Sequence, residues 1–264
     1  MGVIDFHTHA FPNRLAHRAM RTLSRQADWQ PVLDGRLKSL IRSMDAADID
    51  VSVVCAIATK PEQVANIFKW CRKVRSDRIE PFPSVHPDTD DLAGWMKRFA
   101  EAGFAGIKAH PMYQDFAADE PRGLALLSAA AEAGLAVQMH CGRDISFPAD
   151  DDRASPARVR RALEAVPEIK LICTHMGGWR MWDAAAEKLL GARCHMETSF
   201  TSFEVPAGRL VEMIRAHGVD RVMFGTDSPW TDQSAQLAEI RGLGLTNEEL
   251  SKILFANAAR LLRL

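Results

Sequence analysis

The sequence predicts an α/β protein, and within that class a single (β/α)8 TIM barrel, from three observations. Short apolar runs alternate along the chain with longer amphipathic segments, as in parallel strands joined by helices. Eight such strand–helix pairs follow one another, and eight units close a barrel. The 264 residues also match the ~250 typical of this fold, so residues 1–264 are interpreted as one barrel domain.

The predicted strands are rich in Val, Ile and Phe and are bounded by Gly or Pro. They cover Val3–His7, Val51–Ala58, Arg78–Val85, Phe104–Ala109, Ala136–Cys141, Leu171–His175, His195–Ser199 and Arg221–Gly225. The helices predicted after them cover Gly35–Ala47, Pro61–Val74, Thr89–Ala102, Arg122–Ala133, Pro156–Val166, Trp182–Leu190, Pro206–His217 and Ser234–Gly242, with a last one at Asn247–Leu262. A doubly wound open sheet is the alternative, but no G-x-G-x-x-G turn follows the first strand.

One long segment, Ala10–Asp34, follows the first strand and is interpreted as irregular. We expect residues 10–34 to form a lid or substrate loop on the active face, with a disordered insert as the alternative.

Composition excludes several classes of protein. Hydrophobic residues make up 47% and charged residues 25%, near the globular average, which excludes global disorder. The net charge of −1 offers no electrostatic basis for a nucleic-acid or membrane partner. The five cysteines form no C-x-x-C pair, and no signal peptide or membrane span is recognised. We therefore expect a reduced, cytoplasmic protein that acts on a small molecule, with a homodimer as the default assembly.

Six of the nine histidines fall at or just past the carboxyl end of a predicted strand: His7, His9, His86, His110, His140 and His175. In a barrel these strand ends surround one mouth, where catalytic groups gather.

The pair His7 and His9 is spaced so that both rings leave the strand on the same face. On strict alternation the barrel interior would receive Val3, Asp5, His7 and His9, and the helix side Ile4, Phe6 and Thr8. An H-x-H pair alone is a weak motif, since any two polar residues can end a strand. It gains force because His140, His175 and Asp227 end other predicted strands.

His7, His9, His140 and Asp227 form a nitrogen and oxygen set suited to one divalent ion. Zinc is the first expectation, with manganese, iron or cobalt possible. Such a set leaves a position for water, whose pKa the ion would lower toward 7. Asp5 would either fix a histidine tautomer from behind or simply bond the backbone.

Six stretches carry a resemblance to a known family: Ile4–His9, Gly106–Pro111, Met139–Gly142, Thr174–Gly178, Phe224–Trp230 and Asn257–Leu262. In this order they resemble the amidohydrolase superfamily, and more closely its amidohydrolase-2 branch of metal-dependent hydrolases and decarboxylases related to aminocarboxymuconate-semialdehyde decarboxylase. The resemblance implies a barrel with a metal at its mouth, bound by His7, His9 and His140. It further implies that Asp227 is a ligand and proton carrier, and that His175 is a general acid/base or oxyanion stabiliser.

The chain departs from related branches at two positions. Where the nuclease-like branch carries a metal-bridging Glu on the fourth strand, this chain has Lys108. Three roles stay open for Lys108: a contact to a substrate carboxylate, a structural ion pair, or a carbamate that bridges two metals. Lys108 and His110 are two residues apart along the strand direction, so both side chains are expected to face the mouth. Glu197 stands where family members often have Asp, and no role is assigned to it.

Other loop residues have open roles. Arg143 would bind a substrate carboxylate or be solvated, and His86 would line the pocket or act as a cap. His17, His195 and His217 are interpreted as structural. Aromatic residues in or beside the loops would build an apolar wall for a ring substrate or only pack the loops: Tyr113, Phe116, Phe147, Trp179, Trp182 and Trp230.

The leading interpretation is a metal-dependent hydrolase, in which metal-activated water attacks an ester, lactone or amide of a small organic acid. His175 would stabilise developing charge, and Asp227 would take and return the proton. Lys108, Arg143 and Trp230 would contact the substrate. The alternative is a metal-dependent, non-oxidative decarboxylase or hydratase of an aromatic or unsaturated carboxylic acid. A non-catalytic binding barrel would not need metal ligands around its mouth.

Overall fold

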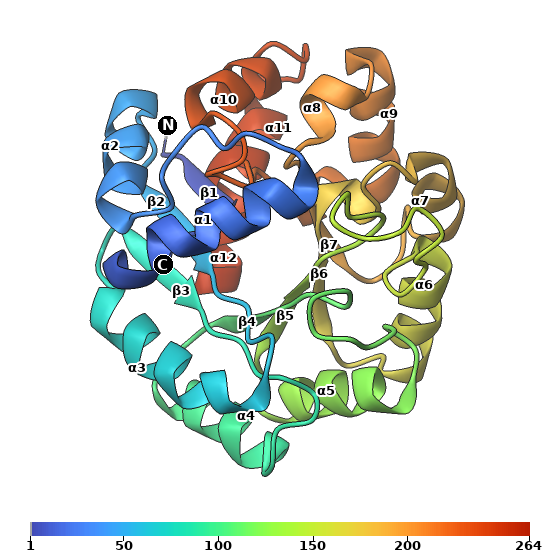
Figure 1. The fold of residues 1–264 in the computed structure, drawn as a ribbon. Helices are drawn as coiled ribbons and strands as arrows, with labels where there is room; N and C mark the ends of the chain where they lie inside the picture. Colours follow the sequence, from blue (N-terminus) through green and yellow to red (C-terminus); the bar gives the residue numbers. More distant parts are fainter. Residues whose placement is uncertain (1) are drawn as a thin grey trace.

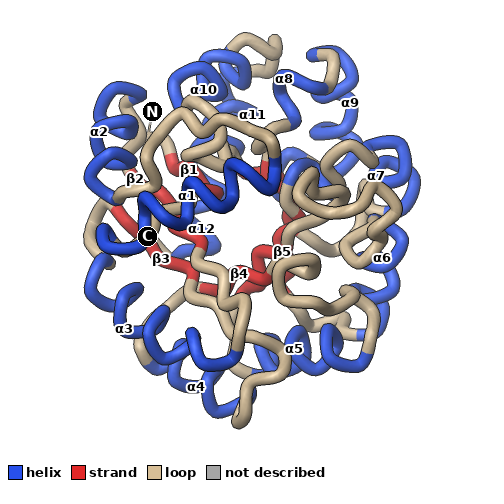
Figure 2. The backbone as a smooth tube through the Cα atoms, viewed as in Figure 1, coloured by secondary structure: helices blue, strands red, loops and turns tan. Residues whose placement is uncertain are grey.

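The computed structural model of the protein describes residues 2–264, whose parallel strands form a ring around a central axis (Figure 2). The strands are β1 (Ile4–Thr8), β2 (Val51–Cys55), β3 (Ile79–Phe82), β4 (Gly106–Ala109), β5 (Ala136–Met139), β6 (Lys170–Cys173), β7 (His195–Glu197) and β8 (Val222–Met223). Each lies within or overlaps a predicted strand, and the predicted α/β barrel is confirmed.

The ring consists of two ladders, β1-β2-β3 and β4-β5-β6-β7-β8, joined by sparser hydrogen bonds at two seams. At one seam the Phe6 N–H donates to the Phe224 carbonyl at 2.8 Å, and at the other the Lys108 N–H donates to the Pro83 carbonyl at 2.8 Å. The second seam is thin because Pro81 and Pro83 have no N–H to donate.

Helices cover the outside of the ring, and the first helix lies across its opening (Figure 1). They are α1 (Asn13–Ala27), α2 (Leu37–Ala47), α3 (Val64–Val74), α4 (Leu92–Glu101), α5 (Pro121–Glu132), α6 (Pro156–Ala165), α7 (Trp182–Lys188), α8 (Thr201–Glu204), α9 (Ala207–His217), α10 (Gln233–Arg241), α11 (Asn247–Ser251) and α12 (Asn257–Leu262). Every predicted helix is present, and the last one contains a π-helical segment at Lys252–Ala256. None of the helices in residues 2–264 is both long enough and apolar enough to cross a membrane.

The prediction of an irregular segment at residues 10–34 is wrong, because most of it forms α1. This helix lies across the opening of the barrel (Figure 1) and lines the cavity there. Its buried side chains are Ala16 and Met20, four residues apart on one face. That spacing was readable in the sequence, but the four arginines of residues 13–27 obscured it.

For the residues that precede His7 in the first strand, the prediction of which side chains face the barrel interior is wrong. Ile4 and Phe6 lie inside the barrel, in one cluster with residues of β3, β6 and β8, whereas Asp5 reaches Gln233 on α10. The register against β2 shifts between Asp5 and Thr8, because a β-bulge places one extra residue in β1. A bulge moves the following side chains to the opposite face, and this is why His7 still points inward.

Candidate metal centre and cavity

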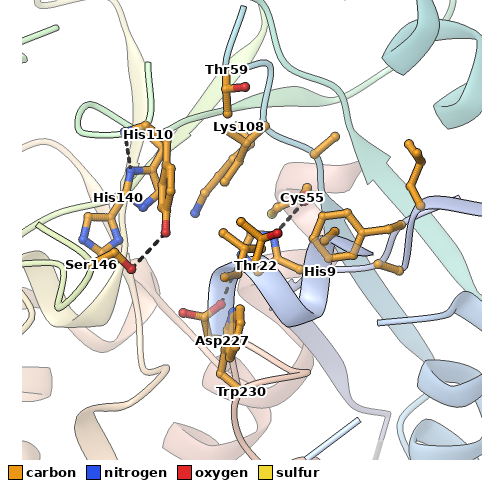
Figure 3. A pocket seen from close by; sticks show the side chains of 18 of the residues that line it. His9, Thr22, Cys55, Thr59, Lys108, His110, His140, Ser146, Asp227 and Trp230 are labelled. Atoms are coloured by element: carbon orange, nitrogen blue, oxygen red, sulfur yellow. Dashed lines mark hydrogen bonds and ion pairs between the residues drawn. The ribbon is translucent and has the colours of Figure 1, made fainter. Parts of the chain in front are cut away.

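A cavity of about 1280 Å³ opens at the carboxyl ends of the strands. His9, Lys108, His140, Asp227 and Trp230 line it (Figure 3). The strand ends therefore bring together most of the site residues that the sequence singled out.

Three of the four predicted ligands form one compact group at the inner end of this cavity. His7, His9 and Asp227 each place a donor atom within 4.8 Å of the others. The His7 and His9 Nε2 atoms are 3.2 Å apart, and Asp227 Oδ1 lies 3.1 Å from His9 Nε2 and 3.5 Å from His7 Nε2.

His140, the fourth predicted ligand, meets this group through His175. Its Nδ1 atom lies 3.2 Å from His175 Nε2, and His175 Nε2 lies 4.0 Å from Asp227 Oδ2. The structure thus places His140 and His175 side by side on the edge of the group, and the division of ligand and catalytic roles between them stays a prediction.

Each of the four rings is held from behind by an oxygen acceptor. The contacts are His7 Nδ1 to Glu197 Oε1 at 3.0 Å, His9 Nδ1 to the Cys55 carbonyl at 2.8 Å, His140 Nε2 to the Arg143 carbonyl at 2.9 Å, and His175 Nδ1 to Ser199 Oγ at 2.8 Å. A ring that donates from one nitrogen presents a lone pair at the other. The four inner nitrogens therefore all present lone pairs to the same space.

These facing lone pairs fit a cation. Asp227 Oδ1 is buried without a hydrogen-bond donor, and His9 Nε2 lies 3.1 Å from it, on the side of the ring opposite the Nδ1 atom that contacts the Cys55 carbonyl. Lys108 Nζ donates to one of the inner nitrogens, His7 Nε2, at 2.9 Å, but a buried acceptor without a donor, such as Asp227 Oδ1, is unfavourable. A divalent ion among the facing lone pairs would satisfy all of them at once.

The protonation states suit metal binding as well. Burial lowers the pKa of His7 and of His140 well below the usual value, and it lowers that of His175 to about 4. Burial alone would raise the pKa of Asp227, but His7, His9 and His175 hold it well below its usual value. At neutral pH the rings of His7, His140 and His175 are therefore neutral and the Asp227 carboxylate is charged, as ligands must be.

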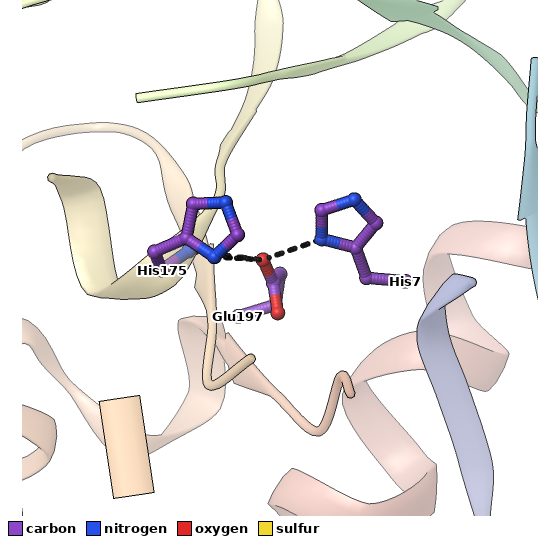
Figure 4. Close-up of side chains that lie close together, drawn as sticks. All are labelled: His7, His175 and Glu197. Carbon is purple, nitrogen blue, oxygen red and sulfur yellow. Dashed lines mark hydrogen bonds and ion pairs between the residues drawn. The ribbon is translucent and has the colours of Figure 1, made fainter. Parts of the chain in front are cut away.

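Glu197, to which sequence reasoning assigned no role, supports the site from below (Figure 4). This fully buried carboxylate accepts from His7 Nδ1 at 3.0 Å, from the His175 N–H at 2.9 Å, and from the Ser199 hydroxyl and N–H at 2.8 and 2.7 Å. A carboxylate behind a histidine fixes the tautomer and orientation of the ring. The available signal was an acidic residue inside a predicted strand, because a carboxylate is rarely buried there without partners.

Asp5, the residue suggested for that supporting role, contacts no histidine ring. Its carboxylate accepts from the Thr226 N–H at 3.0 Å, from Gln233 Nε2 at 2.7 Å and from the His7 N–H at 3.2 Å. The alternative interpretation, a buried Asp bonded to the backbone, is the one that the structure supports.

Gly225 on the neighbouring chain segment makes room for Glu197. A Cβ at this position would lie 2.2 Å from Glu197 Oε2 and 3.1 Å from His7 Cβ. Glycine therefore lets the carboxylate pass beneath the histidine.

Lys108 is buried, at 1% exposure, and its Nζ lies 2.9 Å from His7 Nε2. Within residues 2–264 no carboxylate oxygen lies within 4.0 Å of this ammonium group, so the structure contains no ion pair for it. The substrate-contact and carbamate roles stay open.

His110 lines the cavity as expected. Its ring stacks on that of His140 with centroids 4.2 Å apart, and its Nε2 lies 3.2 Å from Asp144 Oδ2. His86 lies outside the lining, where its Nδ1 accepts from the Asp88 N–H at 3.2 Å, as a cap does.

The predicted substrate contacts differ in their placement. Trp230 lines the cavity, whereas Arg143 is exposed and is absent from the lining. The structure does not bring the Arg143 side chain to the site, and only its carbonyl contributes, through His140.

Aromatic side chains do line the cavity, but they are not the same set that the sequence predicted. Of the predicted aromatic residues, Tyr113, Phe147, Trp179 and Trp230 line the cavity. Phe116 packs in the core and Trp182 packs against it. Phe11 and Trp29 join the lining from residues 10–34, the segment expected on the active face, and Phe200 joins it from the chain just after the seventh predicted strand.

Two site residues have a left-handed backbone. His175 has φ 56° and Asp227 has φ 63°, a conformation that costs a non-glycine residue free energy and gathers at functional sites. The His175 N–H bond to Glu197 helps to hold this geometry.

Comparisons with known proteins agree with this geometry. A family model described as amidohydrolase matches residues 4–264. No curated protein sequence gives a significant match.

Solved structures share the fold at low identity. A 5-carboxyvanillate decarboxylase variant from Novosphingobium aromaticivorans, with bound manganese and 3-methoxy-4-hydroxy-5-nitrobenzoic acid, is 15% identical with a TM-score of 0.74, over 100% of this chain and 97% of that one. A 2,6-dihydroxybenzoate decarboxylase from Rhizobium is 16% identical with a TM-score of 0.71, over 100% and 99%. A probable 2-pyrone-4,6-dicarboxylic acid hydrolase from Acinetobacter baumannii, with citric acid bound, is 15% identical with a TM-score of 0.68, over 100% of both chains.

Proposed function

The chain belongs to the amidohydrolase family whose model spans residues 4–264, and from this premise we propose that it is a metal-dependent decarboxylase of an aromatic carboxylic acid. The observation that carries the proposal is the convergence of four inward imidazole nitrogens and Asp227 beneath an aromatic-lined cavity. Such a site can hold an ion and a ring together.

The comparisons favour decarboxylation over the hydrolysis that the sequence analysis placed first. Two of the similar structures are decarboxylases, and one of these holds manganese and a substituted benzoic acid. The aromatic wall of Tyr113, Phe147 and Trp230 gives a flat ring an apolar surface on which to stack.

His7, His9 and Asp227 would hold the ion, with His140 or His175 completing the set. When bound, a divalent ion supplies Lewis-acid polarisation of substrate oxygens. Zinc and manganese both accept this nitrogen and oxygen set, so the identity of the ion is left to measurement.

Lys108, Asp227 and His175 would perform the remaining steps. The Lys108 ammonium binds a substrate oxygen and orients the ring. The bond from ring carbon to carboxyl carbon breaks, carbon dioxide leaves, and the ring carbon keeps the electron pair and takes a proton. Asp227 Oδ2 and His175 Nε2, 4.0 Å apart, are placed to carry that proton and to regain it from water.

Hydrolysis is the second candidate. Its supporting observation is the likeness to a probable 2-pyrone-4,6-dicarboxylic acid hydrolase, because the same residues can serve attack on a lactone carbonyl. Asp227 would then take a proton from water and pass it to His175 Nε2, which would donate it to the leaving oxygen of the opened lactone.

Metal content tests the site. We expect about one divalent ion per chain, lost in His7→Ala and kept in His17→Ala, a control at an exposed histidine of α1. Elemental analysis of the purified proteins decides this. Full retention in His7→Ala would contradict the ligand set, and two ions per chain would favour a carbamate on Lys108.

Product analysis tests the reaction. Hydroxybenzoic acids and lactones are incubated with the metal-loaded protein, and carbon dioxide and new carboxylate are measured together. Carbon dioxide with a decarboxylated ring supports the proposal. A new carboxylate without carbon dioxide would identify the hydrolase instead.

A further inference from the structure

The cavity is much larger than a single ring requires. Its volume is about 1280 Å³, whereas a cavity of roughly 150 Å³ holds benzene. The excess lies beyond the strand ends, where α1 and α3 contribute lining residues. We call this part the outer groove and define it by Arg14, Leu15 and Arg18 of α1 and Lys69, Trp70 and Lys73 of α3.

The outer groove carries positive charge without internal partners. Arg14, Arg18, Lys69 and Lys73 are exposed, and among residues 2–264 none of them has a carboxylate oxygen within 4.0 Å. The carboxylates that line the cavity are Asp144 and Asp227, and both are held by histidines at the inner end.

This accumulation is local. The whole chain has a net charge of −1, yet residues 13–27 contain four arginines and no Asp or Glu. Several arginines elsewhere form ion pairs, as Arg158 does with Asp119 at 2.8 Å. The four cations of the outer groove have no such partner and lie together beside the mouth of the barrel.

The spacing on both helices adds to the repulsion. Arg14 and Arg18 are four residues apart on α1, and Lys69 and Lys73 are four apart on α3. Like charges at this spacing destabilise a helix. A bound anion between the helices would offset that repulsion.

Apolar side chains lie between the charges. Leu15, Ala19 and Leu23 form a stripe along α1, and Ile67 and Trp70 face the cavity from α3. Leu15 is 45% exposed, so its apolar surface is available to a ligand in the groove. The groove thus combines an apolar floor with a cationic rim.

We propose that the outer groove binds an apolar arm of the substrate that ends in an anionic group, while the ring acid occupies the inner end. This proposal rests on the proposed function in one respect only, the identity of the ring acid at the inner end of the cavity. The substrate is then a long, at least doubly anionic acid rather than a small benzoate.

The groove is tested with a probe that needs neither metal nor turnover. 1-Anilinonaphthalene-8-sulfonate combines apolar rings with one sulfonate, and its fluorescence reports binding. We expect saturable binding of one probe per chain, about tenfold weaker in Arg18→Gln/Lys69→Gln, from two exposed ionic contacts near the upper end of their usual range. Added salt should weaken wild-type binding, because exposed charges are screened.

The matched control is Arg21→Gln/Arg72→Gln, which removes one cation from each helix at exposed positions outside the lining. It should bind the probe as the wild type does. Absence of saturable probe binding, or equally weakened probe binding in both double variants, would overturn the proposal that the outer groove binds an anionic arm.

His7→Ala separates this proposal from the proposed function. It should lose metal and turnover but keep probe binding, so failure of the metal chemistry would leave the groove result intact. With an active ring acid in hand, Arg18→Gln/Lys69→Gln should raise KM about tenfold for a derivative with a carboxylate-ended alkyl arm. KM for the unsubstituted acid should not change, and a rise for both acids would overturn the assignment of the arm.

Discussion

Replacing Glu197 by Gln tests whether the buried carboxylate sets the orientation of the metal-binding histidines. All four of its contacts come from donors: His7 Nδ1, the His175 N–H, and the hydroxyl and N–H of Ser199. An amide must turn its NH2 group toward at least one of these donors. No rotation of the Gln side chain therefore satisfies the site.

The expected magnitude follows from these contacts. If the NH2 group replaces Oε2 it faces the Ser199 N–H, and if it replaces Oε1 it faces three donors, including His7 Nδ1. The His7 ring then loses its fixed tautomer or its position. Loss of such a supporting contact typically costs about 10- to 100-fold in metal affinity, which corresponds to roughly 1.4–2.7 kcal/mol.

The assay is competition for zinc or manganese between the protein and a chromophoric chelator, read as the metal Kd. Glu212→Gln is the matched control, because Glu212 is an exposed residue of α9. Thermal unfolding of both variants in the apo form shows whether the fold is kept. An unchanged metal Kd in a folded Glu197→Gln protein would refute the supporting role.

Three further predictions concern catalysis, packing and pH. The His175→Asn variant should keep its metal and lose at least about 100-fold in kcat, whereas the His140→Asn variant should lose the metal first. Loss of metal from His175→Asn would instead place the ion between β5 and β6. Gly225→Ala should lower the free energy of unfolding in urea by about 1–3 kcal/mol, because the added Cβ overpacks the site. In the control Gly208→Ala there is open space around the Cβ, and the change should stabilise α9 by up to about 1 kcal/mol. Similar changes in the free energy of unfolding for both variants would refute the close approach of Gly225 to Glu197. Burial lowers the pKa of His217 to about 4, so the unfolded chain takes up its proton first as pH falls, and stability present above pH ~6.5 is lost toward pH 4. Between pH 7 and 5 the wild type should lose about 2 kcal/mol more than His217→Gln, and parallel curves would contradict a neutral, buried ring.

The sequence alone determined the barrel and the rim on which the site lies. The order of apolar runs and amphipathic segments predicts parallel strands, and parallel strands of one barrel end at one mouth. A histidine or carboxylate that ends a strand therefore lies near that mouth, although His86 shows that its side chain need not enter the cavity. For this reason His7, His9, His140, His175 and Asp227 could be selected before their distances were known.

Register and side-chain direction needed the tertiary structure. The bulge in β1 is defined only by its pairing with β2, and it reversed the predicted direction of Asp5. A strand read alone shows its period of two, but an extra residue becomes visible only against a neighbour.

The supporting contacts also needed the tertiary structure, because they join distant parts of the chain. Glu197 reaches His7 across 190 positions of sequence, through space that Gly225 leaves open. α1 lies across the mouth and brings Arg14 and Arg18 to the cavity. Local periodicity carries no information about which distant segment will fill such a space, because that is decided by packing of the closed barrel.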